Sequence, residues 1–267
     1  MTESAEESVF QPADYDNEFD GKAYLELFYS EEAMSHGNRI SLFLLPNYVE
    51  VIRKTTPADK RITLLDVGSG PTIYSAICFR NIVSKIFLSD YLDSNLEIIR
   101  KWLDKKNNFD WTPVIKTIAR NEGLPTTEST FNKIENETRD VLRDGGILHS
   151  NVHKKWILGT NPENEFDVLV SIFCLEAACS SMSEYKRALK NMMRLLRSGG
   201  YFILGSVLDD DQYVCGVFQD KPKIFSVLNL TEKCIFNALE EAGIDLSTMI
   251  RTDLRHQGVI FCMAKKI

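Results

Sequence analysis

Two acids that close successive apolar segments have the clearest potential for ligand chemistry. Asp66 lies at the end of the run 61–67, and Asp90 ends the next run, 85–90. The loop Gly68-Ser69-Gly70 follows the first run, and its two glycines let a ligand approach the backbone with no Cβ in the way. Asp66 can accept hydrogen bonds from a cationic amine, and Asp90 can accept both hydroxyls of a ribose. The combination indicates a nucleoside with a positively charged amino-acid tail, which is S-adenosylmethionine.

The same loop departs from two other nucleotide-binding loops. A dinucleotide-binding loop reads G-x-G-x-x-G, and Ile73 stands where its third glycine belongs. A P-loop needs Gly-Lys-Ser/Thr after four residues, and that sequence is absent. Because S-adenosylmethionine is a methyl donor, this loop predicts a methyltransferase. Two other functions stay open, an NAD-dependent oxidoreductase and a non-catalytic protein that binds S-adenosylmethionine. The loop could also be a plain turn in a parallel sheet with no ligand.

Strands and helices alternate around this loop, which predicts an α/β fold with a parallel sheet joined by right-handed crossovers. The helices that we expect after the early strands cover 73–83 and 94–106, and a later one covers 184–197. We then expect a hairpin with strands at 214–218 and 224–228, followed by a helix over 232–242. The expected strands are 61–67, 85–90, 114–118, 147–152, 166–171, 201–208, 249–254 and 259–264.

Three segments of the chain do not follow this alternation of strands and helices. Residues 1–13 offer little to bury and are expected to be disordered. The rest, 14–267, is expected to form a single domain. Its first part, 14–60, should form a helical cover, with helices over 14–29 and over 33–54, the latter kinked at Pro46. The polar stretch 120–146, with a possible helix over 132–143, is interpreted as an insertion or a lid-like excursion.

Composition limits the possible partners. The chain has 267 residues, 44% of them hydrophobic, and a formal net charge of −7. This acidity argues against nonspecific binding of nucleic acids or anionic membranes, and no apolar run is long enough to cross a bilayer. The six cysteines lack C-x-x-C spacing and the four histidines show no metal-ligand pattern. We therefore expect a cytoplasmic protein with reduced thiols, no metal, no nucleic-acid or membrane partner, and a monomeric state.

Seven segments spread over nearly the whole chain from about residue 20 carry a family resemblance, namely AYLELFYS (23–30), LLDVGSGPTIY (64–74), SDYLDSNLEIIRKWL (89–103), FDWTP (109–113), LVSIFCLEAAC (169–179), YKRALKNMMRLLRSGGYFIL (185–204) and GVIFCMAKK (258–266). With these segments the chain resembles a family of small-molecule methyltransferases, the nicotinamide/phenylethanolamine/indolethylamine (thioether) N-methyltransferases. This resemblance implies a Rossmann-like class I methyltransferase fold, with a seven-stranded, mostly parallel sheet, helices on both faces and an N-terminal helical cover. It also implies S-adenosylmethionine as methyl donor and a small amine or N-heterocycle as acceptor.

The resemblance also assigns cofactor-binding roles at matching positions. Asp90 should hold the ribose, Tyr91 should lie against the adenine, and Asn95 should support the amino-acid tail. The family has Asp-Val at the adenine where this chain has Asn151-Val152, although an amide oxygen can still accept a bond from the adenine amino group. The full set of expected cofactor residues is Tyr24, Tyr29, Gly68, Ser69, Gly70, Thr72, Tyr74, Asp90, Tyr91, Asn95, Asn151 and Val152.

Two further acids are candidate catalytic residues. Glu176 follows the expected strand 166–171 and Asp210 follows 201–208, so both belong at the carboxyl edge of the sheet, where such folds bind ligands. In the phenylethanolamine branch, acids at these aligned positions hold the substrate amine. The alternative for Asp210 is a solvated turn made by the three acids 209–211.

Other acceptor contacts follow from the same resemblance. Ser206 stands where the nicotinamide branch has an Asp that binds the amide. Tyr213 aligns with a tyrosine found in both branches and is a candidate to cover the acceptor ring. Phe173 is a candidate wall of the same pocket. Near the C-terminus, the amine branch has an acid one residue away from Asp253, and whether Asp253 replaces it is left open.

Overall fold

A seven-stranded sheet forms the centre of the molecule in a computed structural model, which describes residues 9–36, 40–57, 59–106, 109–160, 163, 165–218 and 221–267. The strand order is β4-β3-β2-β5-β6-β10-β9. The first five are parallel, whereas β10 runs antiparallel to both β6 and β9. This confirms the expected α/β fold. The strands are β2 (Ile62–Val67), β3 (Val83–Asp90), β4 (Gly146–His149), β5 (Phe166–Ile172), β6 (Leu196–Val207), β9 (Ile244–Thr252) and β10 (Val259–Lys266).

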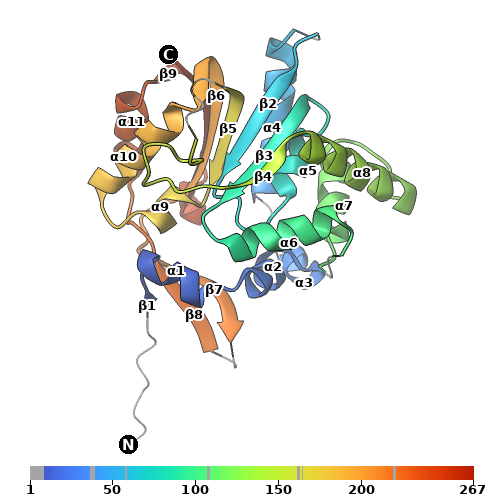
Figure 1. Cartoon of the computed structure of the whole chain (residues 1–267), viewed down its shortest axis with the longest axis horizontal. Coiled ribbons are helices and arrows are strands. Elements are labelled where there is room, and N and C mark those ends of the chain that lie inside the picture. The colour runs from blue at the N-terminus through green and yellow to red at the C-terminus, as the bar shows by residue number, and fades with distance from the viewer. Residues whose placement is uncertain are drawn as a thin grey trace, which may run out of the picture.

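Helices cover both faces because successive strand residues point to opposite sides of the sheet. Leu64 and Val168 pack into one core with the helices α4 to α8, whereas Leu65 and Leu169 pack into a second core with α10 and α11. Figure 1 shows α10 and α11 on one side of the sheet and α5, α7 and α8 on the other. The helices are α4 (Ile40–Thr55), α5 (Tyr74–Phe79), α6 (Asp93–Leu103), α7 (Thr112–Asn121), α8 (Glu128–Asp144), α9 (Leu175–Ala178), α10 (Met182–Met193) and α11 (Glu232–Glu241).

A smaller sheet and the N-terminal helices lie together below the main sheet in Figure 1. The hairpin strands β7 (Gln212–Phe218) and β8 (Lys221–Ser226) are antiparallel, and β1 (Val9–Phe10) adds to β8 in parallel. The N-terminal segment is thus bound to a hairpin about 200 residues away in sequence. The remaining elements here are η1 (Pro12–Asp14), α1 (Tyr15–Glu18), α2 (Gly21–Tyr29) and α3 (Glu31–His36), with η2 (Arg255–Gln257) near the C-terminus.

The expected strand over 114–118 is wrong, because these residues lie in α7. Val114, Ile115 and Ile118 are buried and share one helical face. Pro113 stands in the first turn of the helix, where its missing N–H costs nothing. A short apolar run does not by itself distinguish a strand from a buried helix face.

Two polar regions are also more structured than expected. Within 120–146, α8 buries Ile134, Thr138 and Leu142 and packs against β3 and α7, so it is part of the crossover to β4 rather than a lid. Residues 9–13 form β1 and begin η1 instead of being disordered, and the earlier residues of that expected tail lie outside the described part. No described helix is long and apolar enough to span a bilayer.

Candidate active site

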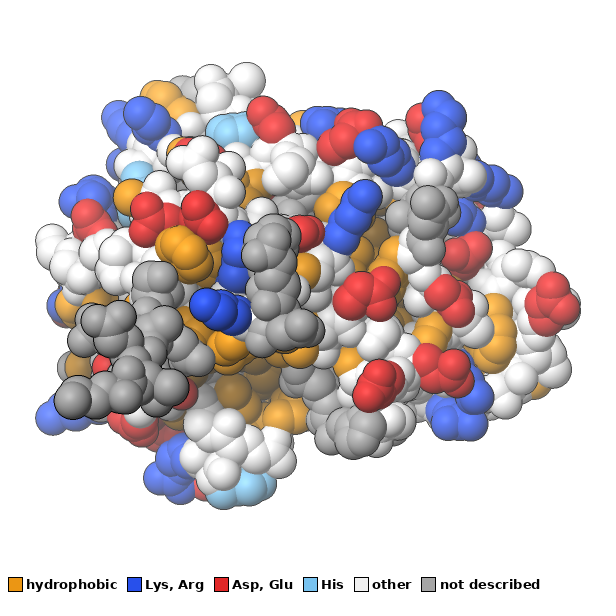
Figure 2. Space-filling view, turned by 90° about the horizontal axis from the view of Figure 1, so that it is seen from below, with side chains coloured by type: hydrophobic (Ala, Val, Ile, Leu, Met, Phe, Trp, Pro, Cys, Tyr) orange, Lys and Arg blue, Asp and Glu red, His pale blue; other side chains and the backbone are white. Residues whose placement is uncertain are grey.

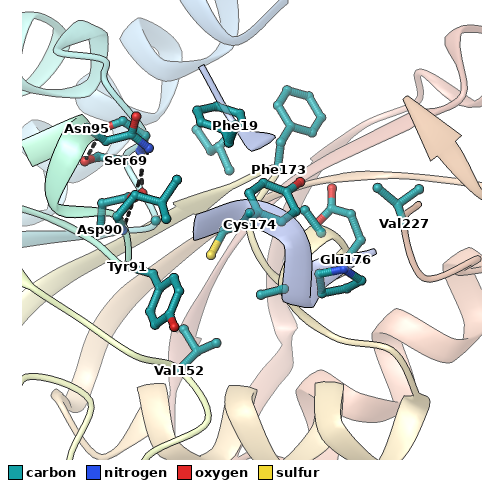
Figure 3. Close-up of a pocket in the computed structure, with 18 of the residues that line it drawn as sticks. Phe19, Ser69, Asp90, Tyr91, Asn95, Val152, Phe173, Cys174, Glu176 and Val227 are labelled. Carbon is teal, nitrogen blue, oxygen red and sulfur yellow. Dashed lines mark hydrogen bonds between the residues drawn. The ribbon is translucent and has the colours of Figure 1, made fainter. Parts of the chain in front are cut away.

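A cavity of about 1000 Å³ lies at the carboxyl ends of β2, β3 and β5. The N-terminal segment and β7 close it from the other side. Figure 3 shows Asp90, Asn95 and Ser69 at one end, called here the cofactor end, and Phe173, Glu176 and Val227 at the other. All twelve expected cofactor residues line this cavity, which are Tyr24, Tyr29, Gly68, Ser69, Gly70, Thr72, Tyr74, Asp90, Tyr91, Asn95, Asn151 and Val152.

The glycine loop is held against β3, and both of its glycines have left-handed backbone conformations. The N–H groups of Gly68 and Ser69 donate to the carbonyl of Ser89 at 2.8 and 2.9 Å. Gly68 has φ 76°, and a Cβ there would collide with the Cys174 side chain. Gly70 has φ 60°, and a Cβ there would meet nothing within 4 Å. Gly70 therefore leaves open space for a ligand beside the backbone.

Asp90 is 8% exposed and joins the loop to α6. Its Oδ2 accepts a bond from the Gly70 N–H at 2.8 Å, and its Oδ1 accepts from the Leu92 N–H at 2.9 Å and from the Asn95 Nδ2 at 3.0 Å. Burial raises the pKa of this carboxyl, and the three donors oppose the rise. Because each carboxylate oxygen can accept two bonds, Oδ2 keeps one position for a ligand hydroxyl.

Asp66 does not belong to this lining, contrary to the expected contact with a cationic amine. Its carboxylate is 3% exposed and accepts a short hydrogen bond from the Ser75 hydroxyl. Burial raises the pKa of Asp66 to about 7. Asp66 therefore has a structural role, since its hydrogen bond with Ser75 connects β2 to α5.

The N-terminal cover is packed onto the cofactor end through aromatic rings and one glycine. Tyr29 of α2 stacks on Tyr74 of α5 with ring centroids 5.6 Å apart, and the ring centroid of Tyr24 lies 6.2 Å from that of Tyr29. At the start of α2, a Cβ on Gly21 would come within 2.5 Å of the Asn95 Oδ1. This close approach brings α2 directly against α6.

The expected adenine contacts lie at the rim of the cofactor end. Tyr91 is 45% exposed, and its hydroxyl donates to the Asp16 carboxylate at 3.1 Å. Val152 is buried, and the Asn151 Oδ1 accepts a bond from the His153 N–H at 2.9 Å. The Asn151 oxygen still has a second acceptor position.

The other end of the cavity, called here the acceptor chamber, is lined by Tyr15, Phe19, Phe173, Glu176, Tyr213 and Val227. Glu176 on α9 is 1% exposed. Its Oε1 accepts a bond from the Val207 N–H at 2.9 Å, whereas its Oε2 has no hydrogen-bond partner among the described residues. Burial raises the pKa of Glu176 to about 7, and the neighbouring Val207 N–H and Ser206 hydroxyl oppose the rise.

Phe173 precedes this helix in a left-handed conformation that a bulky side chain rarely adopts, with φ 54°. Its N–H donates to the Gly205 carbonyl at 2.8 Å, and its ring meets Phe261 edge-on. Strained backbone of this kind concentrates at ligand sites. The expected acceptor residues Phe173 and Tyr213 both line the chamber, whereas Ser206 is fully buried behind it, beside Glu176.

Neither the expected acid Asp210 nor Asp253, whose role the sequence left open, lines the cavity. Asp210 is exposed, and its carboxylate accepts bonds from the N–H groups of Asp211 and Gln212, as expected of a solvated turn. Asp253 is exposed and pairs with Arg255, which lowers its pKa. The expectation that Glu176 and Asp210 face one pocket is therefore wrong, because the turn after β6 directs Asp210 to solvent.

Several lining residues were missed in the sequence. Tyr15 and Phe19 line the cavity from the helix expected over 14–29, although their recurring aromatic spacing indicates only a helix face that packs on the main domain. Val227, Gln257 and Val259 also line the cavity, although nothing in the sequence marks them as site residues. Only folding brings these segments to the site.

The residues present fit S-adenosylmethionine. Gly70 leaves free space beside the loop, Asp90 keeps an acceptor position, and the buried Asn95 Oδ1 has no hydrogen-bond partner among the described residues. These groups suit a nucleoside with hydroxyls and a cationic amino group. The described residues contain no cluster of His, Cys, Asp and Glu that could hold a metal, and all six cysteines are free thiols.

Comparison with known proteins identifies relatives across the chain. Residues 7–267 match the model of the NNMT/PNMT/TEMT family. A nicotinamide N-methyltransferase from Sus scrofa is 34% identical over 243 residues, 89% of this chain and 86% of that protein. One from Caenorhabditis elegans is 31% identical over 86% of this chain and 82% of that protein. A phenylethanolamine N-methyltransferase from Sus scrofa is 32% identical over 76% of this chain and 72% of that protein.

Solved structures agree on the fold. A magnesium protoporphyrin IX methyltransferase from Synechocystis, with bound S-adenosylmethionine, has a TM-score of 0.57 at 10% identity and covers 96% of this chain and 95% of its own. The amino pentose methyltransferase CalS10 from Micromonospora echinaspora has a TM-score of 0.53 at 13% identity. The match covers 88% of this chain and 96% of that chain. Because the three curated relatives are N-methyltransferases, the oxidoreductase and the non-catalytic alternatives are set aside. The chain belongs to the NNMT/PNMT/TEMT family and is an S-adenosylmethionine-dependent N-methyltransferase.

Proposed function

We propose that the methyl acceptor is a small amine or N-heteroaromatic molecule whose nitrogen enters the acceptor chamber. The observation that carries this proposal is the Glu176 Oε2, a buried carboxylate oxygen without a hydrogen-bond partner among the described residues. An unpaired buried carboxyl is costly unless a ligand supplies a donor or a positive charge. The aromatic walls around it suit a flat or ring-bearing acceptor.

For the cofactor, we propose that the twelve residues of the cofactor end bind and orient it. S-adenosylmethionine supplies, when bound, a methyl group on a sulfonium centre. Asp90 would hold the ribose and keep Gly70 in place, and Asn95 would receive the amino-acid tail. The N-terminal cover excludes water from the site, and transfer depends mainly on such positioning.

Glu176 has a specific role for a basic amine. A protonated amine is attracted to the carboxylate, but only the neutral amine has the lone pair that takes the methyl group. The carboxylate must therefore hold the ammonium and accept its proton, or pass it to water, before transfer. A pKa near 7 suits this exchange at neutral pH.

A nicotinamide-like acceptor is the second candidate, because two of the relatives above are nicotinamide N-methyltransferases. A pyridine nitrogen is already neutral at pH 7 and needs no base. Ser206 lies beside Glu176 and would support an amide group only indirectly, because it is fully buried. Asp210 has no part in either proposal, since it lies outside the cavity.

The test is a methyl-transfer assay with nicotinamide, phenylethylamine, indolethylamine and a thioether side by side, with the product identified by mass spectrometry. We expect transfer to nitrogen and preference for one of the first three. Methylation of the thioether alone would contradict the proposal, because sulfur needs no carboxylate beside it.

We also propose that the enzyme is a cytoplasmic monomer that acts without nucleic acid or membrane, and that residues 14–267 form one domain with 14–60 as its cover. The net charge of −7 and the six free thiols support the first part. The packing of α4 and α5 in one core supports the second. Light scattering after gel filtration tests the oligomeric state, and limited proteolysis tests the domain.

A further inference from the structure

Two tyrosine hydroxyls meet in the wall of the acceptor chamber. Tyr15 of α1 and Tyr213 of β7 are joined by a hydrogen bond of 2.6 Å between their hydroxyl oxygens. Phe225 is fully buried behind them, with ring centroids 4.4 Å from Tyr15 and 6.2 Å from Tyr213. Phe19 stacks on Tyr15 at 5.5 Å. The two rings are therefore held firmly, so the position of the hydroxyl pair is defined.

This pair has one proton more than its hydrogen bond uses. Each hydroxyl has one proton and two acceptor positions, so a single bond between them leaves one O–H without an acceptor. No other described residue hydrogen-bonds either hydroxyl. Burial raises the pKa of both phenols, so both protons are present at neutral pH. The remaining O–H is a donor without a partner, and both tyrosines line the cavity.

The acceptor chamber thus has two polar features in otherwise largely apolar walls. One is the unpartnered Glu176 Oε2, and the other is the unused O–H of the tyrosine pair. Phe19, Phe173 and Val227 supply much of the remaining surface (Figure 3). A molecule that fills this chamber without a hydrogen-bond acceptor would leave the tyrosine donor buried and unpaired, which is unfavourable.

We propose that the Tyr15–Tyr213 hydroxyl pair is a specificity site that donates a hydrogen bond to an oxygen atom on the methyl acceptor. The inference rests on the proposed function, since it assumes that Glu176 faces the nitrogen of the same molecule. It predicts an acceptor with two polar groups, the nitrogen that is methylated and a carbonyl, ether or hydroxyl oxygen on its ring. An acceptor with the nitrogen alone is a poorer substrate.

The donor exists only when the N-terminal segment is seated on the hairpin. Tyr15 reaches Tyr213 because β1 pairs with β8 and because the Lys223 ammonium donates to the Glu18 carbonyl at 2.8 Å. The Tyr91 hydroxyl also donates to the carboxylate of Asp16, the residue next to Tyr15. Recognition of the acceptor's oxygen is therefore coupled to closure of the segment 9–20 over the chamber.

The test compares matched acceptors in the wild type and in the double variant Tyr15→Phe/Tyr213→Phe. The probes are nicotinamide against 3-methylpyridine, and 3-methoxyphenylethylamine against 3-methylphenylethylamine. For each pair of probes, the ratio of the two kcat/KM values is measured. The ratio of the two Kd values is also measured with S-adenosylhomocysteine in place of the methyl donor, so that the preference in binding is known without turnover. The double variant is needed because a single remaining hydroxyl could still turn to the ligand. Tyr48→Phe is the control, because the buried Tyr48 hydroxyl has no described partner and does not line the cavity.

We expect the wild type to prefer the oxygen-bearing probe, and the double variant to reduce that preference about tenfold, as loss of one hydrogen bond allows. Tyr48→Phe should leave the preference unchanged. An unchanged ratio in the double variant overturns the inference. So does an equal loss for both probes of a pair, which would assign the hydroxyls to closure alone. Failure of the proposed function is distinct, since the wild type would then methylate none of the four probes.

Discussion

The backbone N–H of Gly70 donates a hydrogen bond to the Oδ2 of Asp90 at 2.8 Å. The bond joins the loop after β2 to the end of β3, so one carboxylate both shapes the glycine loop and faces the cavity beside it. The same oxygen has one acceptor position left. Loop geometry and ligand binding are therefore linked through Asp90.

Asp90→Ala should weaken binding of S-adenosylmethionine by at least about tenfold, because a hydrogen bond to a charged carboxylate is lost and the loop loses its anchor. Calorimetric titration of the folded variant checks this. Asp210→Ala is the control, since Asp210 is exposed and outside the cavity. Equal affinities of Asp90→Ala and wild type would remove the ribose role from Asp90.

Gly70→Val should abolish cofactor binding while the far-UV circular dichroism stays native. The added side chain would enter the open space beside the loop, where we place the cofactor. Gly123→Val is a matched control, because Gly123 also has a left-handed backbone, at φ 70°, and no atom near its Cβ position, but lies outside the cavity. If both variants bind the cofactor equally well, the loop is only a structural turn.

Glu176→Gln should reduce methylation of amines far more than methylation of pyridines. Glutamine can neither attract an ammonium by charge nor accept its proton, whereas a pyridine needs neither. The comparison uses kcat/KM for phenylethylamine and nicotinamide in the same variant, with Asp210→Asn expected to behave as wild type. Equal losses for the two acceptors would mean that Glu176 shapes the chamber without acting on the amine.

The stability of the ligand-free protein should depend on pH through Glu176. Its pKa is about 7 in the folded state, against an ordinary value of 4.5, so the unfolded chain releases this proton first. The contribution of Glu176 to stability is therefore full below about pH 4.5 and is lost as pH rises towards 7. Glu176→Gln should show a smaller fall in thermal midpoint between pH 4.5 and pH 8 than the wild type. The same fall in both proteins would place the carboxyl in contact with water.

The sequence was informative where local pattern and chemistry coincide. Asp90 and the glycine loop were identified because strand ends and tight turns have strong local signals. Thr231 directly precedes the helix expected over 232–242, as Thr does at an N-cap, and its side chain does accept the Cys234 N–H. The strand expected over 114–118 failed because four or five apolar residues fit a strand and a buried helix face equally well.

By itself, then, the sequence determined the α/β fold, the family and the cofactor, since these follow from local periodicity and from motifs contiguous in the chain. Only the tertiary structure decided which of the two candidate acids lines the cavity. Glu176 and Asp210 look equivalent in sequence, yet α9 buries the first and a turn exposes the second. The tyrosine pair is likewise invisible in the sequence, because its two members lie 198 residues apart and meet only when the N-terminal segment packs on the hairpin. The physical reason is that burial and contact between distant residues depend on the packing of whole elements, which no local pattern encodes.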